Sequence, residues 1–284
     1  MKIIKNLSEN EKFIIADKGT ERPFTGKYDK HFEKGIYTCK NCGLPLYRSE
    51  DKFDSGCGWP SFDDEIPGAV LKTPDKDNIR TEITCSYCGA HLGHVFEGEN
   101  LTDKNIRHCV NSVSMDFTVN ENEINYERAF FAAGCFWGTE SLFKKAEGVV
   151  GTVVGYSGGK KSFPTYDMVC YGFTGHAETV QVVYDKRKTD YEKLVKYFFE
   201  LHDFTEINRQ GPDIGHQYRS VIFYTDTDQK ETALKIIENL KEKNYDVATK
   251  VEKMTDFWKA EEYHQDYYIK TGGKPYCHYL RKIF

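Results

Sequence analysis

The sequence predicts two domains, an all-β domain followed by an α+β domain. Residues 20–118 are rich in Gly, Pro and Asp and contain only short apolar runs, which is typical of strands joined by turns. Residues 119–127 are polar and acidic, and beyond them apolar residues recur at helical spacing. Because 284 residues suffice for two domains, we assign the first to 1–118, the linker to 119–127 and the second to 128–284.

The first domain is expected to consist of antiparallel sheets, preceded by a short helix within the first 18 residues. Its apolar runs are separated by turn-forming residues, which is the pattern of short strands. The predicted strands are Gly35–Cys39, Ala69–Thr73, Ile83–Thr84 and Ser114–Val119.

The second domain is expected to have a mixed sheet with helices packed on it. The predicted strands are Ala129–Ala133, Val149–Val154, Thr179–Tyr184 and Ser220–Tyr224, and the predicted helices are Thr139–Ala146, Tyr191–Leu201 and one containing Ala233–Leu240. Their order along the chain predicts a split βαβ core of the ferredoxin-like type. The last residues, 271–284, contain Gly272, Gly273 and Pro275 and predict an irregular tail that is able to move.

Charge and hydropathy exclude several classes of function. The net charge of −5 disfavours nucleic acid as a partner, because duplex-binding proteins carry a basic face. No apolar run approaches 18 residues, so we expect no membrane span. The first 13 residues lack the apolar core of a signal peptide. We therefore expect a soluble, cytoplasmic protein without nucleic-acid or membrane partners.

Nine cysteines in a cytoplasmic chain indicate metal or redox chemistry rather than a disulfide framework. Four of them form two C-x-x-C pairs, Cys39 with Cys42 and Cys85 with Cys88, and each pair is followed by a glycine. Four thiolates suit one tetrahedral, structural Zn²⁺ ion per chain, because protein ligands then fill every position. A redox C-x-x-C pair or an iron–sulfur site is the alternative.

Cys135 lies where an apolar run gives way to a helical pattern. Unpaired N–H groups and the positive end of the helix dipole favour a thiolate at such a position. Phe136 and Trp137 follow directly and could form the wall of an apolar pocket. This pattern favours a reactive nucleophile beside a hydrophobic site, and the alternative is an inert cysteine on a core strand.

Further motifs surround the C-x-x-C pairs of the first domain. They are Gly19–Gly26, Phe53–Phe62, His91–Phe96 and Arg107–Ser112. Together with the two cysteine pairs they resemble the B-type methionine sulfoxide reductases, over roughly residues 5–120.

The residue types in these motifs suit the reduction of a sulfoxide. Arg107 and Cys109 are two apart and face the same side of a strand, so the guanidinium should lower the pKa of the thiol. The side chains suited to donate hydrogen bonds to a sulfoxide oxygen are His91, His94 and Asn111. Trp59 offers an apolar face to a methyl group. Zinc ligation or core packing is the alternative for the histidines. The resemblance implies that Cys57 resolves the sulfenic acid of Cys109 as a disulfide.

A second series of motifs begins at Cys135. It comprises Gly134–Gly138, Gly155–Gly159, Pro164–Tyr166, Thr174–Glu178, Gln210–Arg219 and Tyr263–Tyr267. This series resembles the A-type methionine sulfoxide reductases, from about residue 127 to the end. The resemblance implies attack by Cys135 and proton donation by Glu178, which requires a carboxyl pKa raised by burial. The resemblance also implies that Tyr166 and Tyr218 form hydrogen bonds to the sulfoxide oxygen and that Asp213 supports the surroundings of Cys135 and Glu178. Phe136 and Trp137 are implied to hold the methyl group. The implied resolving thiol is Cys277.

A chain that resembles both types should repair both epimers of methionine sulfoxide, since each epimer needs its own enzyme type. The resemblance implies that the A-type half takes the S epimer, that the B-type half takes the R epimer, and that thioredoxin reduces each disulfide. Substrates would be oxidised proteins and free methionine sulfoxide. The alternatives are a thiol peroxidase or disulfide oxidoreductase, a zinc-stabilised redox sensor, and a zinc-knuckle nucleic-acid binder.

Overall fold

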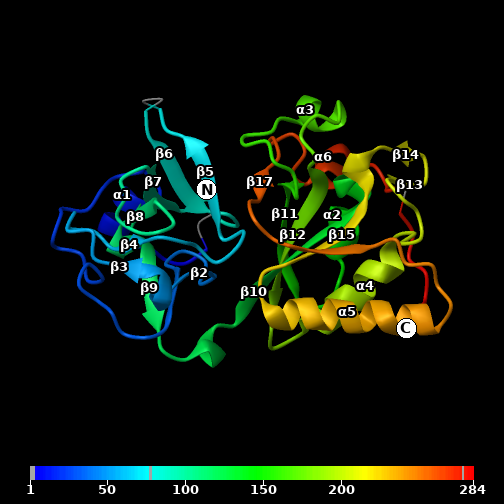
Figure 1. Cartoon of the computed structure of the whole chain (residues 1–284), viewed down its shortest axis with the longest axis horizontal. Helices are drawn as coiled ribbons and strands as arrows, with labels where there is room; N and C mark the ends of the chain where they lie inside the picture. The colour runs from blue at the N-terminus through cyan, green and yellow to red at the C-terminus, as the bar shows by residue number, and fades with distance from the viewer. Residues whose placement is uncertain (1–3, 77–78, 277) are drawn as a thin grey trace. The chain divides into compact units, whose positions relative to one another are not determined.

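The computed structural model describes residues 4–76, 79–276 and 278–284, and the chain divides into two units, 1–125 and 126–284 (Figure 1). The segment predicted as a linker, 119–127, holds the 3-10 helix η3 (Glu121–Glu123) and the first two residues of β10 (Tyr126–Ala133). Among the described residues, no helix is long and apolar enough to cross a membrane.

The N-terminal unit is β-rich and contains two antiparallel sheets. The smaller sheet has the order β2-β1-β9, formed by β1 (Ile36–Cys39), β2 (Pro45–Arg48) and β9 (Met115–Thr118). The larger has the order β3-β4-β8-β7-β6-β5, formed by β3 (Lys52–Phe53), β4 (Ser61–Phe62), β5 (Val70–Pro74), β6 (Thr81–Cys85), β7 (His91–Glu97) and β8 (Ile106–Val110). The N-terminal unit also contains two 3-10 helices, η1 (Ser49–Asp51) and η2 (Ser112–Ser114).

The predicted helical lead-in is α1 (Glu9–Ile15). Ser8 and Glu11 form a reciprocal capping box at its start, so two backbone donors that a helix end leaves unpaired are satisfied. Ile14 and Ile15 are buried and attach the helix to the unit. The helix is short, so packing rather than intrinsic propensity stabilises it.

Strands β7 and β8 carry two of the sequence motifs and form the centre of the larger sheet. In the register of the ladders, Cys109 of β8 lies opposite His94 of β7 on one side and opposite Ser61 of β4 on the other. The apolar pattern did not predict β7, because its polar residues interrupt the alternation of buried side chains. The sheet therefore brings together motifs that are distant in the sequence.

The C-terminal unit is an α+β structure with a mixed sheet. The strand order is β16-β15-β10-β12-β11-β17, and only β15 and β16 pair in parallel. The strands are β10, β11 (Val149–Ser157), β12 (Ala177–Asp185), β15 (Ser220–Tyr224), β16 (Lys250–Lys253) and β17 (Trp258–Lys259), with a separate hairpin of β13 (Arg209–Gln210) and β14 (Asp213–Ile214). The helices are α2 (Phe136–Phe143), α3 (Tyr166–Cys170), α4 (Tyr191–Leu201), α5 (Thr227–Glu242) and α6 (Tyr267–Thr271), with the 3-10 helix η4 (His216–Tyr218).

The core of this unit forms where two helices cover β10. The Phe131 ring stacks on Phe143 of α2 at 4.9 Å and on Phe198 of α4 at 5.2 Å between centroids. On the opposite face of the strand, Phe130 packs against Phe257. Both faces of β10 are therefore buried, which explains why its sequence is a continuous apolar run rather than an alternating one.

Helix α2 begins three residues earlier than predicted, at Phe136, with Cys135 as its N-cap residue. Gly134 has φ of 87°, which is a left-handed conformation that lets the chain turn directly from β10 into the helix. The turn therefore ends the strand and starts the helix around the cysteine.

The C-terminal segment is irregular beyond α6, as predicted, but its last residues are anchored. His278 is 5% exposed and its Nε2 contacts the carbonyl of Ala133. Arg281 donates to the carbonyl of His202 at 2.8 Å, and the Ile283 N–H donates to the Glu200 carboxylate. These contacts attach the end of the chain to α4, which differs from the freely moving tail that the glycines predicted.

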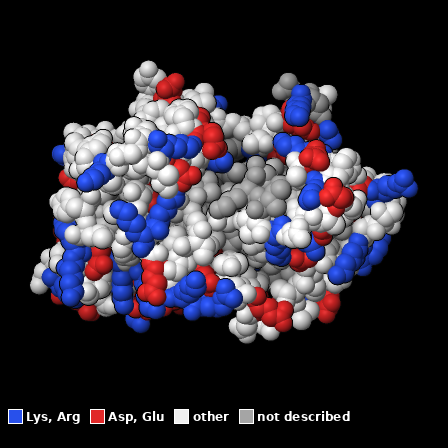
Figure 2. Space-filling view, turned by 180° about the vertical axis from the view of Figure 1, so that it is seen from behind, with Lys and Arg blue, Asp and Glu red and all other residues white. Residues whose placement is uncertain are grey.

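Figure 2 shows one face of the molecule, on which lysine and arginine side chains are interspersed with aspartate and glutamate. The mixture agrees with a net charge of −5, which is small for a chain of this length. Many of these charges are paired; for example, Lys104 contacts Asp51, Asp63 and Asp64.

Candidate active sites and metal centre

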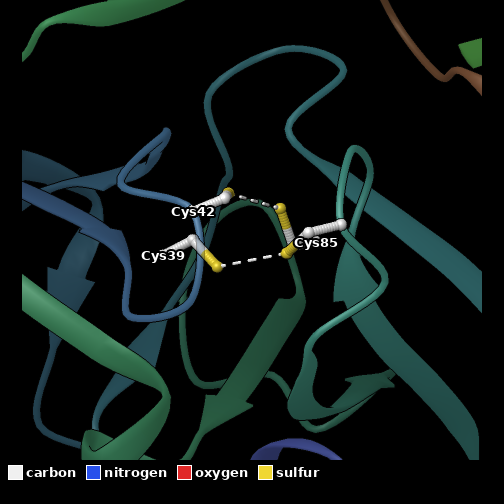
Figure 3. Close-up of side chains that lie close together, drawn as sticks. Cys39, Cys42 and Cys85 are labelled. Carbon is white, nitrogen blue, oxygen red and sulfur yellow. Dashed lines mark hydrogen bonds between the residues drawn. The ribbon is translucent and has the colours of Figure 1, made fainter. Parts of the chain in front are cut away.

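The four cysteines of the C-x-x-C pairs meet in one buried cluster (Figure 3). Cys39 Sγ lies 3.6 Å from Cys88 Sγ, and Cys42 Sγ lies 3.7 Å from Cys85 Sγ. All four sulfur atoms lie within 4.8 Å of one another. Thiolates bound at 2.3 Å to tetrahedral zinc are about 3.8 Å apart, so the donor set fits this ion.

Each C-x-x-C pair forms a tight turn closed by its glycine. The Gly43 N–H donates to the Cys39 carbonyl at 2.7 Å, and the Gly89 N–H donates to the Cys85 carbonyl at 2.9 Å. Both glycines have positive φ, 78° and 72°, where other residues are strained. Because Cys39 ends β1 and Cys85 ends β6, the cluster connects the two sheets of the unit.

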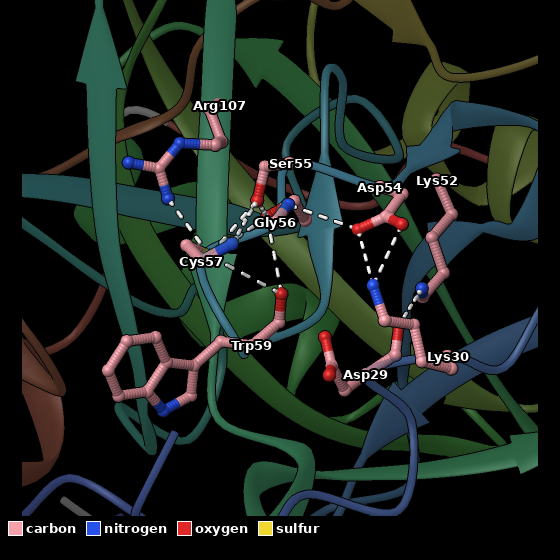
Figure 4. A network of polar contacts seen from close by, with 10 residues as sticks. Asp29, Lys30, Lys52, Asp54, Ser55, Gly56, Cys57, Trp59 and Arg107 are labelled. Atoms are coloured by element: carbon pink, nitrogen blue, oxygen red, sulfur yellow. Dashed lines mark hydrogen bonds and ion pairs between the residues drawn. The ribbon is translucent and has the colours of Figure 1, made fainter. Parts of the chain in front are cut away.

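A second pair of sulfur atoms lies in the N-terminal unit, and Figure 4 shows the surroundings of one of them, Cys57. Cys57 Sγ is 3.9 Å from Cys109 Sγ, although the residues are 52 positions apart. Cys57 is on the loop between β3 and β4, and Cys109 is on β8. This distance brings the predicted nucleophile and the predicted resolving thiol within reach of a disulfide after a small movement.

Arg107 acts on both thiols, and the loop around Cys57 adds a further donor, Ser55. Ser55 Oγ lies 3.0 Å and Arg107 Nη1 3.5 Å from Cys57 Sγ. The hydrogen bond from the Cys109 thiol, followed by that from Ser55, lowers the pKa of Cys57 to about 4 against the opposing effect of burial. The same contact, with burial, raises the pKa of Cys109. The expected lowering for Cys109 is therefore reversed in this arrangement, because two thiols in contact share one negative charge and Cys57 has more donors.

A cavity of about 210 Å³ opens beside Cys109. Its lining includes three predicted site residues besides the cysteine: Trp59, His94 and Asn111. The Trp59 indole donates to the Glu21 carbonyl at 3.1 Å, and the Asn111 amide donates to the Leu92 carbonyl at 3.1 Å. These bonds fix the orientation of the cavity wall.

The two predicted histidines are each held by a carboxylate that sequence analysis did not identify. His91 Nδ1 contacts Glu82 at 2.8 Å, and Lys18 contacts the same carboxylate at 2.6 Å. His94 Nε2 contacts Asp75 at 2.8 Å. The two histidines therefore contact their carboxylates through different ring nitrogens, Nδ1 in His91 and Nε2 in His94. His91 Nε2 is buried without a hydrogen-bond partner among the described residues. Burial lowers the pKa of His94 and therefore favours its neutral form.

In the C-terminal unit, Cys135 and Glu178 meet at the start of α2. The Phe136 N–H donates to Glu178 Oε2 at 2.9 Å. Glu178 is 2% exposed, and burial, followed by the charge of Cys135, raises its pKa well above the usual range. The raised pKa favours the protonated carboxyl next to the cysteine, which is the direction that a proton donor requires.

Aromatic side chains surround this centre. The Phe136 ring lies 5.0 Å from His264, and Tyr166 lies 4.4 Å from the same ring. Trp137 stacks on Tyr267 at 3.7 Å and donates its indole N–H to His264 Nδ1 at 3.0 Å. The motif Tyr263–Tyr267 therefore builds the wall of the site, a function that its sequence pattern did not indicate.

Three further groups lie close enough to Glu178 to affect pKa values. Burial and then the hydrogen bond with Cys170 raise the pKa of Tyr166, and burial and then Glu178 raise that of Tyr218. Asp213 contributes a buried Oδ2 that has no hydrogen-bond partner among the described residues. Cys170 is thus in contact with Tyr166. Cys277 lies outside the described residues.

Two family models match successive parts of the chain. The model described as "SelR domain" matches residues 7–119, and the model described as "Peptide methionine sulfoxide reductase" matches residues 127–283.

Relatives of each half are similar over most of their own length. The peptide methionine sulfoxide reductase MsrA of Nautilia profundicola is 48% identical over 54% of this chain and 88% of its own. The peptide methionine sulfoxide reductase B5 of Arabidopsis thaliana is 59% identical over 39% of this chain and 81% of its own. The crystal structure of reduced Mxr1 from Saccharomyces cerevisiae matches with a TM-score of 0.53 and 38% identity, over 56% of this chain and 93% of that one. The chain therefore belongs to the peptide methionine sulfoxide reductases, with a B-type domain followed by an A-type domain in one polypeptide.

Proposed function

We propose that the two units of this methionine sulfoxide reductase divide the substrate by epimer, the A-type unit reducing the S form through Cys135 and the B-type unit the R form through Cys109. The observation that carries the proposal is the protonated Glu178 carboxyl beside Cys135, at the end of its hydrogen bond from the Phe136 N–H. A nucleophile paired with an acid is what thiolate attack on a sulfoxide needs, because the oxygen must gain protons to leave as water or hydroxide.

In the A-type unit, the sulfur of Cys135 attacks the substrate sulfur while Glu178 protonates the oxygen. Tyr166 and Tyr218 donate hydrogen bonds to that oxygen, and Phe136 and Trp137 hold the methyl group against the aromatic wall. Asp213 supports the polar side of the site. Methionine leaves, and Cys135 remains as a sulfenic acid, which Cys277 resolves as a disulfide.

In the B-type unit, Cys109 is the nucleophile and the cavity beside it receives the substrate. His91 and His94 protonate the oxygen, with Asn111 as a further donor, and Trp59 contacts the methyl group. Arg107 stabilises the anionic sulfur that forms during the cycle. The 3.9 Å separation of the sulfur atoms supports Cys57 as the resolving thiol. Since one proton is shared between the two thiols, approach of the substrate must transfer the charge from Cys57 to Cys109 before attack.

Glu82 and Asp75 are the positioning residues of this site. Each carboxylate accepts a hydrogen bond from one ring nitrogen of its histidine and so selects the tautomer. The remaining nitrogen of each ring is then directed away from the carboxylate, and in the imidazolium form, which the carboxylate favours, it carries the proton that is transferred to the substrate oxygen. The pair of rings, 5.7 Å apart, supports proton delivery by either histidine.

The cysteine cluster of the B-type unit holds one structural Zn²⁺ ion through Cys39, Cys42, Cys85 and Cys88. The sulfur distances support this ion, and mutual contacts and burial raise the pKa of Cys39 in the absence of a cation. A bound Zn²⁺ ion would offset the unfavourable burial of negatively charged sulfur atoms by binding the thiolates. The high cysteine count of the chain fits a cytoplasmic location, where thiols are kept reduced, and a dithiol reductant of the thioredoxin type. In the A-type unit, the order β15-β10-β12-β11 supports a ferredoxin-like core.

The test is turnover of each pure epimer, free or in a peptide, with dithiothreitol as reductant. Cys109→Ser should abolish R-epimer reduction and leave S-epimer reduction intact, and Cys135→Ser should do the reverse. Loss of both activities in either variant would contradict the division of the substrate between the units.

A further inference from the structure

On the loop between β3 and β4, Cys57 lies among polar groups (Figure 4). The side chain is half-buried and follows Gly56, which is exposed. The donors Ser55 Oγ and Arg107 Nη1 lie 3.0 Å and 3.5 Å from its sulfur, and Ser61 Oγ and the Trp59 carbonyl oxygen each lie 3.6 Å from it. Resolution of a sulfenic acid on Cys109 needs only a second thiol within reach, so these donors exceed what that step requires.

The guanidinium of Arg107 is fixed in place before any reaction. Glu99 accepts hydrogen bonds from its Nε at 2.7 Å and from its Nη2 at 2.9 Å, and the Phe96 ring lies 4.5 Å beneath it. Nη1, the nitrogen nearest to Cys57, carries two N–H groups. One can stabilise the sulfur while the other donates to an oxygen atom bound next to it, and no reorganisation is needed.

We propose that the Cys57–Cys109 pair also reduces small hydroperoxides, hydrogen peroxide among them, directly and without methionine sulfoxide. Cys57 is the attacking group and is held by the hydrogen bond from Ser55, Arg107 donates a hydrogen bond to the departing oxygen, and Cys109 is the resolving thiol. The order of the two cysteines is therefore the reverse of their order in sulfoxide reduction.

The reaction balances with the two thiols as the only reductant. The Cys57 thiolate attacks one peroxide oxygen, an S–O bond forms, the O–O bond breaks, and the departing alkoxide or hydroxide takes the proton of Cys109. The Cys109 thiolate then attacks the sulfur of the Cys57 sulfenic acid. The S–O bond breaks, hydroxide leaves and takes a proton from solvent, and the disulfide forms. One hydroperoxide yields one alcohol, or water, together with one water and one disulfide.

Ionisation alone does not make this cysteine fast. A pKa of about 4 keeps Cys57 fully ionised at pH 7, whereas an ordinary thiol is only a few per cent thiolate. The intrinsic reactivity of a thiolate falls with its pKa, with a Brønsted slope of about 0.4–0.5, and this offsets the gain. Any advantage must therefore come from the donors, which typically contribute about 10²–10³-fold when aimed at a developing oxyanion.

Cys170 provides an internal reference in the same chain. It is exposed, and burial of part of its side chain raises its pKa. Reduced wild-type protein is mixed with hydrogen peroxide alone and quenched with iodoacetamide, and each cysteine is quantified by mass spectrometry. We expect Cys57 and Cys109 to disappear together as a disulfide, about 10²-fold faster than Cys170 is oxidised. Oxidation of Cys57 no faster than that of Cys170 overturns the proposal.

Three variants separate chemistry from folding. Cys109→Ser removes the resolving thiol, so oxidation of Cys57, with water protonating the departing oxygen, should stop at a sulfenic acid that dimedone traps. Ser55→Ala and Arg107→Lys should slow the oxidation of Cys57 by about tenfold or more, since each removes or misplaces a donor. Equal rates in wild type and both donor variants would overturn the assignment of the donors.

Reduction of the R epimer by the same wild-type preparation keeps this proposal distinct from the previous one. Protein that reduces the R epimer but oxidises Cys57 slowly contradicts the peroxide activity alone. Protein that reduces peroxide but not the R epimer contradicts the epimer assignment and supports the peroxide activity.

Discussion

The two units activate a cysteine by different physical means. In the B-type unit, Cys109 lies on strand β8, and the donors that stabilise a thiolate at the Cys57–Cys109 pair are side chains, Arg107 of the same strand and Ser55 of the β3–β4 loop. In the A-type unit, Cys135 is the N-cap residue of α2, so the backbone itself supplies unpaired donors and a positive dipole end. A strand has no comparable dipole or unpaired donors, so a thiolate on a strand must be stabilised by the side chains around it.

Proton delivery differs in the same way. In the proposed mechanism the A-type unit uses one carboxyl, Glu178, whose pKa burial raises. The B-type unit would use two imidazoles, each hydrogen-bonded to a carboxylate. A buried acid needs no second residue, whereas an imidazole needs a carboxylate to stabilise the charged form that gives up the proton. This comparison predicts that the A-type site depends on burial and the B-type site on a hydrogen-bond network.

The largest expected effect is loss of the cysteine cluster. Cys85→Ser, or prolonged treatment with a chelator, should unfold the B-type unit, because structural zinc contributes about 10–16 kcal/mol in small zinc domains. R-epimer turnover should vanish while S-epimer turnover persists, and the bound zinc should fall below one ion per chain. Zinc analysis, thermal unfolding and epimer assays measure this. Cys170→Ser is the control and should retain its zinc; a fully active, metal-free protein would contradict the prediction.

Glu178→Gln should be next in size. Removing a general acid typically costs about 10²–10⁴-fold in rate, and S-epimer kcat should fall by that factor while R-epimer kcat is unchanged. In the wild type, S-epimer turnover should decline as pH rises through the raised pKa of Glu178, because the carboxyl then loses the proton it donates. The variant should lack that decline.

The matched control for Glu178 is Glu140, another buried carboxylate of the same unit, which accepts hydrogen bonds from Thr152 and from the Asp266 N–H. Glu140→Gln should lower the melting temperature but spare the chemistry. If both variants lose S-epimer activity equally, the loss comes from replacing a buried carboxylate and not from removing a proton donor.

Glu82→Gln should have an intermediate effect, confined to the B-type unit. The change weakens the bond to His91 and leaves Lys18 without its carboxylate, at a cost of about 1–3 kcal/mol, or about 10–10²-fold in R-epimer kcat. A changed pH profile of kcat would distinguish a positioning function from loss of stability. Glu65→Gln is the control, because Glu65 contacts His108 at 3.1 Å outside the substrate cavity. Equal losses of kcat in the two variants would count against the assignment.

The smallest effect concerns the acid stability of the A-type unit. Burial lowers the pKa of His202 to about 3, so folding excludes a proton that the unfolded chain binds near pH 6.5. The stability that His202 contributes is complete above pH 6.5 and is lost as the pH falls toward 3. At pH 5 the loss is about 2 kcal/mol. As the pH falls, the free energy of unfolding of wild type should therefore decrease more steeply than that of His202→Gln. Parallel curves for the two proteins would show that His202 is not the origin of the acid sensitivity.

Sequence patterns predicted elements whose side chains carry a regular burial signal. The i, i+3, i+4 spacing at Ala233, Ile236, Ile237 and Leu240 became the buried face of α5, because a helix repeats its faces every 3.6 residues. The apolar run at 129–133 became β10. Strand β7 was not predicted, since the polar side chains of His91 and His94, both candidate site residues, interrupt its apolar pattern.

The sequence by itself determined the two-part architecture and the four-cysteine set, and it supplied the candidate residues of both sites, because residue type and short spacing carry that information locally. Only the tertiary structure decided which of the paired thiols, Cys57 or Cys109, bears the charge, and that Glu82 and Asp75 hold the histidines. Those facts depend on distances between segments far apart in the chain. Electrostatic interactions act through space and depend on burial, and neither quantity is set by the order of the residues alone.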